Sequence, residues 1–388
     1  MSSMLPKGWK KYNVRQLAKI DEDSLGNRTR TNYKFNYISL SNVNNGVISE
    51  DLRTYHFSDA PSRARRCVKK NDVLMATVRP NLEGFARIKH DIKDTVASTG
   101  FAVISPNIES DSEYIYQYLY SYQIRRQIYA LVVGSNYPAI NSTDVIKLRI
   151  LAPTLPKTRA LIGKLLLTWD MATEKTERLI EAKEKSYKWL IKTLINDQCQ
   201  RWKHLRSEKI FESVSEKNHP KEELLSVTQD RGVIPRTMLE GRVMSPDGST
   251  ASYKLIKRGD FVISLRSFQG GVEYSEYQGI VSPAYTVLRN KLPIHEDFYR
   301  HFFKSYIFIE KYLRIAVIGI RDGKQISMPD FKSVKLPYPP IDDQEKIANV
   351  LNTAQKEIGL LRQQLELLKK QKRGLMQKLL TGQWRVKT

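Results

Sequence analysis

The most regular pattern of apolar and polar positions lies near the end of the chain, after Pro339-Pro340. Apolar residues recur there in alternating steps of four and three with one polar interruption, Lys372, which is the pattern of a coiled-coil seam. The seam consists of Ile347, Leu351, Ala354, Ile358, Leu361, Leu365, Leu368, Leu375 and Leu379. Asp342 followed by Glu345 forms a capping-box pattern, so we expect the helix to begin there. Running to Gly382, it would be roughly 60 Å long at about 1.5 Å per residue.

A second proline-free helix is expected from about Thr158 to Asn196, with a less regular apolar face. Thr168, Lys175 and Ser186 interrupt its seam, which comprises Leu161, Leu165, Ala172, Leu179, Ala182 and Trp189. Such a helix needs a partner to cover its apolar side. The natural partner is the other long helix, and connectivity then makes the pair antiparallel. Pairing with a second copy of the chain or with another protein is the alternative.

An internal repeat organises the rest of the chain. Gly46-Val47-Ile48 recurs as Gly232-Val233-Ile234, and the same offset of 186 residues joins other anchors along the sequence. It places Asp144 on Asp330, Pro153 on Pro339 and Lys183 on Lys369. A fixed offset over so long a span indicates a duplicated structural unit. We therefore predict two domains, residues 1–153 and 201–340, and two helical spacers, residues 154–200 and 341–388.

Within each copy, short apolar runs bounded by turn residues predict strands, for example at residues 72–78 and 260–265. Residues 114–132 and 297–313 have aromatic residues at helical spacing, and packing in a core explains those aromatics better than base stacking. The fold class that follows is α+β. We expect two similar domains, each a mixed sheet plus helices, separated by two long antiparallel helices in a coiled coil and related by a pseudo-twofold axis.

Composition adds the type of partner. The chain has 388 residues and a formal net charge of +23, which favours a polyanion as partner. No apolar stretch is long enough to span a bilayer and no signal-peptide pattern follows Met1, so the cytoplasm is the expected location. The two cysteines, Cys67 and Cys199, are too few for a disulfide framework or a zinc site, and we expect two buried thiols.

Several runs of residues resemble one family, the specificity subunits of type I restriction-modification systems. The run LPYPPIDDQEKIA at residues 336–348, followed by a long helix ending QKLLTG at 377–382, is similar to the distal conserved region of that family. Residues 71–82 and 98–103 look like parts of its target-recognition domains. The first copy departs from the pattern, because Thr154 to Arg159 contains no counterpart of Gln344. We expect a different helix cap or partner contact there and the same fold.

The resemblance implies a subunit that binds double-stranded DNA, two DNA methyltransferase subunits along its helices, and the restriction and translocase subunits. It also implies that each domain reads one half of a two-part site. The repeat leads to the same geometry, because two domains on a stiff spacer would contact half-sites about one or more turns of roughly 34 to 36 Å apart. Since the domains differ in sequence, we expect an asymmetric target. The methyl donor and ATP would belong to other subunits, so no cofactor is expected in this chain.

Base contacts are expected from loops at strand ends that carry arginine, asparagine or glutamine. Arg79 and Asn81 flank Pro80 after a predicted strand, and Arg266 and Gln269 occupy the corresponding neighbourhood of the second copy. Polar, turn-prone loops precede the Asp144 and Asp330 anchors, and by resemblance they match the glycine-containing loops with which the family contacts DNA. Their candidate residues are Ser135, Asn136, Tyr137, Arg321, Lys324 and Gln325. Pairing of Arg79 with Glu83 is the structural alternative.

Phosphate contacts supply affinity and not sequence information. A dense basic cluster has the composition of a phosphate-binding patch, and a solvated basic surface explains it equally well. Its members are Arg63, Arg65, Arg66, Lys69 and Lys70.

Catalytic motifs are weak throughout, which makes a non-catalytic subunit the expected class. Residues 319–324 lack the glycine spacing of a P-loop, and Gln325 stands where serine or threonine would bind magnesium. A metal-dependent endonuclease could use Pro246-Asp247 with Asp322-Gly323-Lys324, although such short fragments occur often by chance. A stand-alone DNA-binding regulator is the other alternative, but two unlike domains in one chain remove its need to dimerise on a palindrome.

Overall fold

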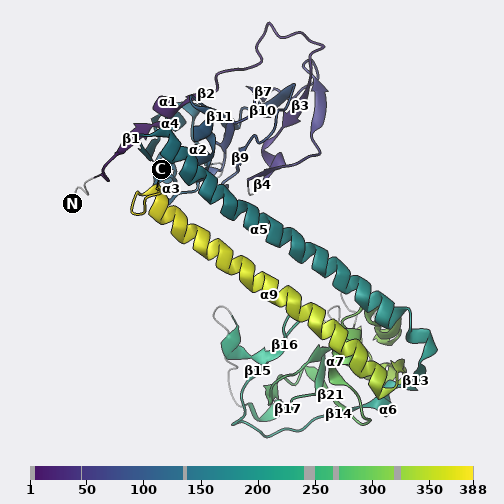
Figure 1. Ribbon diagram of the computed structural model, residues 1–388. Helices are drawn as coiled ribbons and strands as arrows, with labels where there is room; N and C mark the ends of the chain where they lie inside the picture. The colour runs from purple at the N-terminus through teal and green to yellow at the C-terminus, as the bar shows by residue number, and fades with distance from the viewer. Residues whose placement is uncertain are drawn as a thin grey trace. The chain divides into compact units, whose positions relative to one another are not determined.

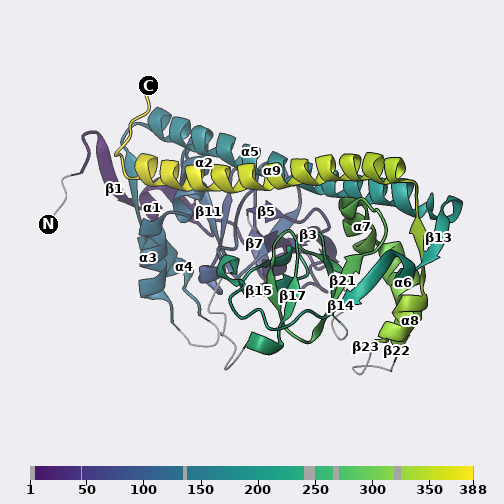
Figure 2. The same ribbon diagram turned by 90° about the horizontal axis from the view of Figure 1, so that it is seen from below.

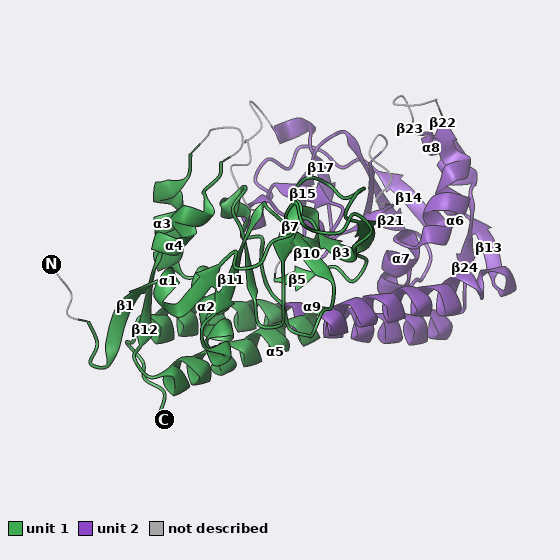
Figure 3. Cartoon of the chain, turned by 90° about the horizontal axis from the view of Figure 1, so that it is seen from above, with its two compact units in different colours: residues 1–177, 363–388 green, residues 178–362 purple. Residues whose placement is uncertain are grey.

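The computed structural model describes residues 5–44, 46–133, 138–239, 250–264, 271–318 and 325–387. The chain divides into two compact units (Figure 3), of which the first contains residues 1–177 and 363–388 and the second residues 178–362. Each unit therefore contains part of both long helices. The described part of the chain has no helix that is both long enough and apolar enough to cross a membrane.

Two four-stranded sheets and a two-stranded ladder make up most of the first unit. One sheet is antiparallel, in the order β2 (Ala18–Ile20), β11 (Phe101–Pro106), β8 (Val73–Ala76), β9 (Phe85–Arg87). The other has the order β6 (Arg53–His56), β3 (Lys34–Ile38), β10 (Thr95–Ser98), β7 (Ala64–Cys67), with β3 and β10 parallel. Strand β1 (Trp9–Asn13) pairs with β12 (Arg149–Pro153), and β4 (Val43–Asn44) pairs with β5 (Val47–Ile48). The predicted mixed sheet is therefore present.

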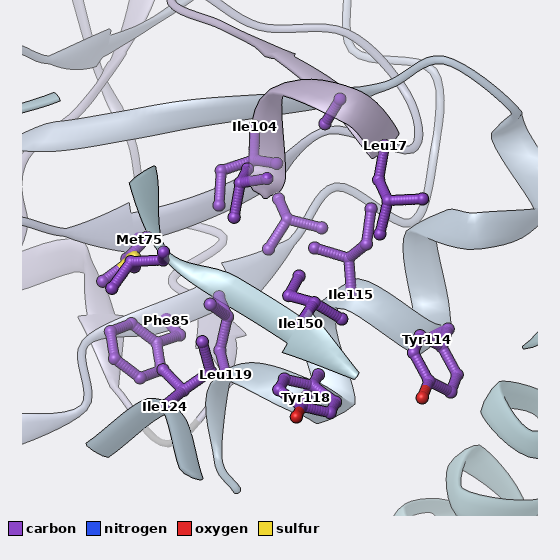
Figure 4. Packing of buried hydrophobic residues seen from close by; sticks show 14 of the residues in the cluster. Leu17, Met75, Phe85, Ile104, Tyr114, Ile115, Tyr118, Leu119, Ile124 and Ile150 are labelled. Atoms are coloured by element: carbon purple, nitrogen blue, oxygen red, sulfur yellow. The ribbon is translucent and has the colours of Figure 1, made fainter. Parts of the chain in front are cut away.

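Four α-helices precede the first long helix among the described residues of this unit. They are α1 (Val14–Leu17), α2 (Ser112–Leu119), α3 (Tyr122–Leu131) and α4 (Ser142–Lys147). Side chains of α2 fill the core between sheet and helices (Figure 4), and Tyr114 and Tyr118 are almost completely buried. The Tyr114 hydroxyl donates to the Leu151 carbonyl at 2.6 Å, and the Leu151 amide donates to the Tyr118 hydroxyl at 3.0 Å. Both aromatic residues therefore pack the core, as predicted, with their polar ends hydrogen-bonded.

The second unit repeats this order of elements. Its main sheet has the order β14 (Phe211–Val214), β21 (Tyr285–Asn290), β18 (Phe261–Ser264), β19 (Glu273–Tyr274), and β13 (Lys203–Arg206) pairs with β24 (Lys335–Tyr338). Its helices are α6 (Ser207–Ile210), α7 (Glu296–Phe303) and α8 (Met328–Ser333). The remaining strands form pairs: β15 (Leu225–Thr228) with β16 (Gly232–Pro235), β17 (Lys254–Ile256) with β20 (Gly279–Val281), and β22 (Val317–Ile318) with β23 (Gln325–Ile326).

The predicted repeat is visible in these bounds. Helices α4 and α8 begin at Ser142 and Met328, and strands β12 and β24 begin at Arg149 and Lys335. Both pairs are separated by the offset of 186 residues found in the sequence. These elements of the two units therefore keep the spacing found in the sequence, whereas the second four-stranded sheet of the first unit has only two-stranded pairs as counterparts among the described residues of the second.

Two helices that we predicted as continuous are interrupted. The helix expected at residues 114–132 is broken after α2, and Ser121 caps α3 by accepting a hydrogen bond from the Ile124 amide at 3.3 Å. The helix expected at 297–313 ends with α7 and continues as a π-helical turn, Phe308–Tyr312, and a 3-10 turn, Leu313–Ala316. Serine competes with the helix for backbone hydrogen bonds, which explains the first break.

The long helices are α5 (Pro156–Ile191), extended by a π-helical turn at Lys192–Asn196, and α9 (Ile341–Leu380). Helix α9 begins one residue before the expected cap, because the Asp343 and Gln344 amides already donate to the Pro340 carbonyl at 3.0 and 3.1 Å. Asp342 therefore lies in the first turn and is not the cap. Its carboxylate is still favourable there because it faces the positive end of the helix dipole.

Helices α5 and α9 are antiparallel within each unit (Figure 1). In the first unit Lys372 forms an ion pair with Asp170, and Lys369 with Glu177 at 2.8 Å. In the second unit Glu357 pairs with Lys183 at 2.8 Å, and Arg362 with Glu184 at 2.5 Å. The predicted antiparallel pairing is confirmed at both places, and Asp170 accounts for the polar interruption at Lys372.

The predicted seam is right for α9 and wrong for α5. All nine predicted apolar positions of α9 are buried or half-buried. On α5, however, Leu165, Leu179 and Trp189 are 37%, 43% and 61% exposed. The covered face of α5 contains Ile162, Leu166, Thr173, Thr176, Ile180 and Tyr187. Its polar residues are satisfied there, because Thr173 and Thr176 donate to carbonyls of α5 itself and Tyr187 bonds to His301 of α7. Hydrophobicity alone therefore identified the wrong side.

Both ends of the sequence belong to the first unit. Gly382 turns the chain after α9 with φ +72°, and a Cβ there would lie 2.8 Å from Pro6 Cγ and 2.9 Å from Trp9 Cε2. The end of α9 therefore packs closely against the residues that lead into β1. Of the two thiols, Cys199 is buried as expected, whereas Cys67 is partly exposed.

Candidate nucleic-acid interface

The two candidate reading segments of the first copy meet at the end of strand β8. The Arg79 amide donates to the Pro138 carbonyl at 2.7 Å, and the Ile140 amide donates to the Thr77 carbonyl at 2.9 Å. Val133 and Ala139 exchange two backbone hydrogen bonds of 3.1 Å. Residues 59 and 63 positions apart in sequence are therefore joined by hydrogen bonds, which places the two candidate segments at one site.

A 3-10 turn, Pro80–Leu82, presents the first of these segments. Arg79 and Glu83 flank it in the left-handed region, with φ of +49° and +53°. Such residues cost on the order of 1 kcal/mol each and persist only where their surroundings fix them. Asn81 and Leu82 are exposed at the turn, while Pro80 is buried. The Glu83 carboxylate pairs with Arg125 of α3 at 3.0 Å, which ties the turn to the neighbouring helix.

Several predicted residues lie outside the part of the chain that the structure describes. In the first copy these are Ser135, Asn136 and Tyr137, and in the second Arg266, Gln269, Arg321 and Lys324. Gln325 is described: it is exposed at the start of β23 and pairs with Ile318 of β22. Residues 319–324 connect these two strands in sequence, so the predicted glycine-containing segment joins the strands of a hairpin.

The predicted phosphate-binding cluster lies on β7 and just after it. Arg66 pairs with Asp21 at 3.0 Å, Lys69 with Glu22 at 3.5 Å and Lys70 with Asp91 at 3.4 Å. Arg65 lies over the Phe57 ring at 4.8 Å from its centre, and Arg63 is exposed. Acidic neighbours therefore offset part of the positive charge that the sequence places here. The pairs of Lys69 and Lys70 are exposed and weak enough to be exchanged for phosphates, whereas the Asp21 side chain that pairs with Arg66 is only 8% exposed. A phosphate-binding role of the cluster stays a prediction.

A buried histidine connects the second unit's domain to both of its long helices. The His301 Nδ1 atom lies 2.8 Å from the Tyr187 hydroxyl of α5, and its Nε2 atom lies 2.8 Å from Asn352 Oδ1 of α9. Because the Asn352 amide group donates to Asp297 at 2.8 Å, its oxygen must accept from His301, and the Tyr187 hydroxyl donates to Nδ1. This arrangement needs a neutral ring, and burial lowers the pKa of His301 from 6.5.

The first unit uses Gln117 at the corresponding place, since Gln117 and His301 are each the sixth residue of an eight-residue helix. The Gln117 side chain is fully buried and donates to Glu113 at 2.8 Å and to Asp170 of α5 at 2.6 Å. Glu113 also pairs with Arg87 of β9 at 2.9 Å. Burial raises the pKa of Glu113, and Gln117 and Arg87 oppose that rise. The α+β domain of each unit is thus held to its long helices by hydrogen bonds of defined geometry.

The two long helices begin with different contacts, as we expected because the first copy has no counterpart of Gln344. Gln344 donates to the Pro339 carbonyl at 2.8 Å and accepts from the His295 amide at 2.9 Å. In the first copy Arg159 donates to the Pro153 carbonyl at 2.9 Å and forms a bidentate pair with Asp111 at 2.7 and 2.8 Å. An arginine-aspartate pair therefore replaces one glutamine, with the same fold around it.

A surface that we did not predict lies on α3. Tyr122 and Tyr129 are 70% and 59% exposed, and Arg126 lies between them on the same face. The helical spacing of these residues is visible in the sequence, but the whole segment 114–132 was interpreted as core. Among the described residues, no group of three or more histidine, cysteine, aspartate or glutamate side chains could hold a metal ion. Asp247 and Asp322, the carboxylates of the endonuclease alternative, lie outside those residues.

Two copies of one α+β domain, each followed by a long helix, define a duplicated protein. In the first copy, exposed polar residues lie at a strand end. A family model described as the type I restriction modification DNA specificity domain matches residues 6–184 and 201–370. The chain belongs to this family. The predicted class, a specificity subunit of a type I restriction-modification system, is confirmed.

Individual relatives are distant in sequence and similar in fold. The chain is 24% identical over 313 residues to the MjaX type I restriction enzyme specificity subunit of Methanocaldococcus jannaschii, covering 74% of this chain and 71% of that one. The crystal structure of the HsdS subunit from Thermoanaerobacter tengcongensis matches with a TM-score of 0.52 at 20% identity, covering 99% of each chain. A chain solved to explain complex assembly and conformational transition of the type I R-M system matches with a TM-score of 0.63 at 19% identity, covering 98% and 100%.

Proposed function

We propose that residues 1–153 and 201–340 each read one half of an asymmetric, two-part DNA site, and that residues 154–200 and 341–388 are spacers. The observation that carries this proposal is a duplicated core with unlike exposed segments. The first copy has the Pro80–Leu82 turn beside Pro138, and the second has the β22–β23 hairpin. A shared core with different surface residues is what two readers of different sequences require, since base contacts depend on side chains at the surface.

The long helices are the proposed binding surface for two DNA methyltransferase subunits. Large apolar residues are exposed on α5 and α9 although each helix is already paired. They are Leu165, Met171, Leu179 and Trp189 on α5, and Val350, Leu360 and Leu367 on α9. Exposed tryptophan and leucine side chains on a rigid helix are typical of protein interfaces. Restriction and translocase subunits would join the resulting complex.

The proposed role of the chain is recognition and assembly without catalysis. Methyl transfer and DNA cleavage would be carried out by the partner subunits, which would bind the methyl donor and ATP. The net charge of +23 supports DNA as the direct ligand, because phosphate neutralisation supplies most of the affinity of such proteins. Since DNA and its modifying enzymes are the proposed partners, we place the subunit in the cytoplasm.

The test is co-expression of this chain with the methyltransferase encoded beside it, followed by sequencing that detects modified bases in the host DNA. We expect methylation confined to an asymmetric two-part motif. Exchange of residues 1–153 for the corresponding domain of another specificity subunit should change one part of the motif and leave the other part unchanged.

Expression of the methyltransferase alone and of this chain alone are the controls, and neither should give the motif. A methylation pattern that is the same with and without this chain would contradict the proposal. Methylation by the chain alone would also contradict it, because the chain would then be an enzyme.

A further inference from the structure

Helix α3 of the first unit has an exposed face with two aromatic residues. Ile124 and Ile128 face the core and are almost fully buried, whereas Tyr122 and Tyr129 on the other side are 70% and 59% exposed. Arg126 lies four residues after Tyr122 and three before Tyr129, so all three are neighbours on one face. Its guanidinium is 5.8 Å from the centre of the Tyr122 ring. We call Tyr122, Arg126 and Tyr129 the α3 face.

The charge around this face is positive. The sequence contains no aspartate or glutamate from Tyr122 to Thr143. Glu83 approaches from the neighbouring turn, but it is paired with Arg125 at 3.0 Å. Arg126 has no ion pair within the ranges that the structure describes, in contrast to Arg66, Lys69 and Lys70 of the basic cluster. An arginine left free beside aromatic rings is available to an anionic ligand.

Exposed apolar residues continue this surface. Leu82, at the 3-10 turn against which α3 packs, is 69% exposed, and Val133, two residues after the end of α3, is 77% exposed. The Glu83–Arg125 pair holds the turn against α3, and Val133 is bonded to Ala139 in the second reading segment. Figures 2 and 3 show α3 and α4 side by side at one end of the first unit. The α3 face and Leu82 therefore border both segments predicted to read DNA.

We propose that the α3 face and Leu82 are a DNA-contacting surface of the first domain. Arg126 neutralises a backbone phosphate, the two tyrosines pack along the sugar-phosphate chain, and Leu82 makes an apolar contact in the groove. Phosphate contacts fix the register of a recognition domain, and an inserted leucine contacts base edges or base steps that differ between sequences. The inference rests on the proposed function and assigns residues to it that the sequence did not indicate.

A protein partner is the competing occupant, because tyrosine and arginine are also common in protein interfaces. The charge favours DNA. The stretch from Tyr122 to Thr143 has 22 residues and no carboxylate, and the chain has a net charge of +23. Such a surface attracts a polyanion more strongly than it attracts an average protein surface. The experiment therefore measures DNA affinity and subunit assembly separately.

The first test uses the purified complex of this chain with its methyltransferase, and a duplex carrying the motif found by sequencing. For Arg126→Gln we expect weaker binding to the target and to unrelated DNA, and a slope of log K against log salt that is smaller by about one. The matched control is Arg15→Gln, which removes an exposed arginine on α1 outside the α3 face. The control should bind both duplexes like the wild type.

The second test is Leu82→Ala, which removes no charge and no buried contact. We expect roughly fivefold weaker binding to the target, with unchanged binding to unrelated DNA and an unchanged salt slope, because an apolar groove contact depends on the base sequence. The control is Ile108→Ala, another exposed apolar residue of the same unit, at 42% exposure. This control should leave both affinities unchanged.

Two outcomes would overturn the inference and leave the proposed function intact. If both variants bind DNA like the wild type, while exchange of residues 1–153 still changes the methylated motif, the α3 face is excluded as a DNA contact. Loss of methyltransferase subunits from the Arg126→Gln complex in native mass spectrometry, with DNA affinity of the intact complex unchanged, would make the face a protein interface. If exchange of residues 1–153 leaves the methylated motif unchanged, the proposed function itself fails.

Discussion

Gly163 lies where α5 passes close to the first turn of α2. A Cβ at this position would be 2.9 Å from the Tyr114 backbone nitrogen and 3.0 Å from Glu113 Cβ. Contacts under 3 Å with a backbone atom force the helices apart, because a backbone atom in a packed helix cannot move aside alone. Glycine is therefore required here by the packing of two helices and not by a turn.

For Gly163→Ala we expect a loss of about 1 to 3 kcal/mol in the free energy of unfolding, from overpacking. The measurement is urea unfolding of the complete chain. Gly374→Ala on α9 is the matched control, because its Cβ would meet no atom within 4 Å. That change should stabilise the protein by roughly 0.5 to 1 kcal/mol, since alanine favours helix more than glycine does. Equal effects at the two positions would contradict the close approach.

At the scale of residues, the sequence predicted which kinds of side chain gather on the surface better than it predicted which side chains pair with them. Arg66, Lys69 and Lys70 were recognised as a cluster, but the acids that pair with them come from other strands and loops, at Asp21, Glu22 and Asp91. Arg126 was missed because the helix that contains it was expected to be one core helix. Helical spacing identifies the residues that share one face of a helix, but only the folded structure shows which face is covered by other elements.

At the scale of elements, the start of α5 depends on one buried ion pair. The side chains of Arg159 and Asp111 are only 4% and 2% exposed. Removing one partner of such a pair leaves a charge without solvent or counter-charge, which costs far more than the pair contributes. The equivalent position of the second copy avoids this risk with the neutral Gln344.

For Arg159→Met we expect a loss of about 3 to 5 kcal/mol in stability, because the Asp111 carboxylate stays buried without a partner. The double variant Arg159→Met/Asp111→Leu should recover most of that loss. Thermal or urea unfolding of the single and double variants measures the difference. A double variant as unstable as the single one would show that packing, and not the unpaired charge, dominates at this site.

His301 predicts a dependence of stability on pH in the second unit. Burial holds its pKa in the folded state below the ordinary value of 6.5, and the unfolded state binds a proton more readily. Stability should therefore be complete above about pH 6.5 and fall as the pH falls further, by up to about 1.4 kcal/mol per pH unit. Urea midpoints at pH 7.5 and 5.5 measure the effect.

The control for this prediction separates His301 from the other five histidines. His301→Gln should be less stable at pH 7.5 and should lose part of the difference between the two pH values, whereas His90→Gln at an exposed position should keep it. An unchanged pH difference in His301→Gln would exclude the buried ring as its source.

The apolar seam of α9 could be predicted because nearly every position on its covered face is hydrophobic. The covered face of α5 could not, because Thr173, Thr176 and Tyr187 take apolar places on it and Leu165, Leu179 and Trp189 are exposed. Tyr187 lies on the covered face because its hydroxyl forms a hydrogen bond with His301 Nδ1. That contact exists only in the folded chain, so no pattern along α5 could show it.

At the scale of the whole molecule, we could predict two similar domains because the sequence contains an internal repeat. The offset of 186 residues, read from anchors such as Asp144 and Asp330, also relates α4 to α8 and β12 to β24. Core elements keep their spacing because insertions there would disturb packing. The segment between β8 and β9 and the segment between β18 and β19 have eight residues each but different sequences, so the surface residues of one copy could not be predicted from the other.

The duplication predicts that the halves of the target can be changed independently. Exchange of residues 201–340 for another recognition domain should alter the part of the methylated motif that exchange of residues 1–153 leaves unchanged. Sequencing of modified bases in cells that express each hybrid with the methyltransferase checks this. The unmodified chain is the control. A hybrid in which both parts of the motif change would mean that the domains do not read separately.

The close approach of Gly382 to Trp9 brings together two segments of the first unit that are far apart in the sequence. Joining the ends of the chain through a short linker and opening it elsewhere, for example at Gln198 after α5, would preserve the contacts inside each unit. Under the proposed function, the order in which a gene encodes the two domains is then arbitrary. Recombination could reverse that order, or replace one reader with a foreign one, and still produce a chain that folds around the same two helices.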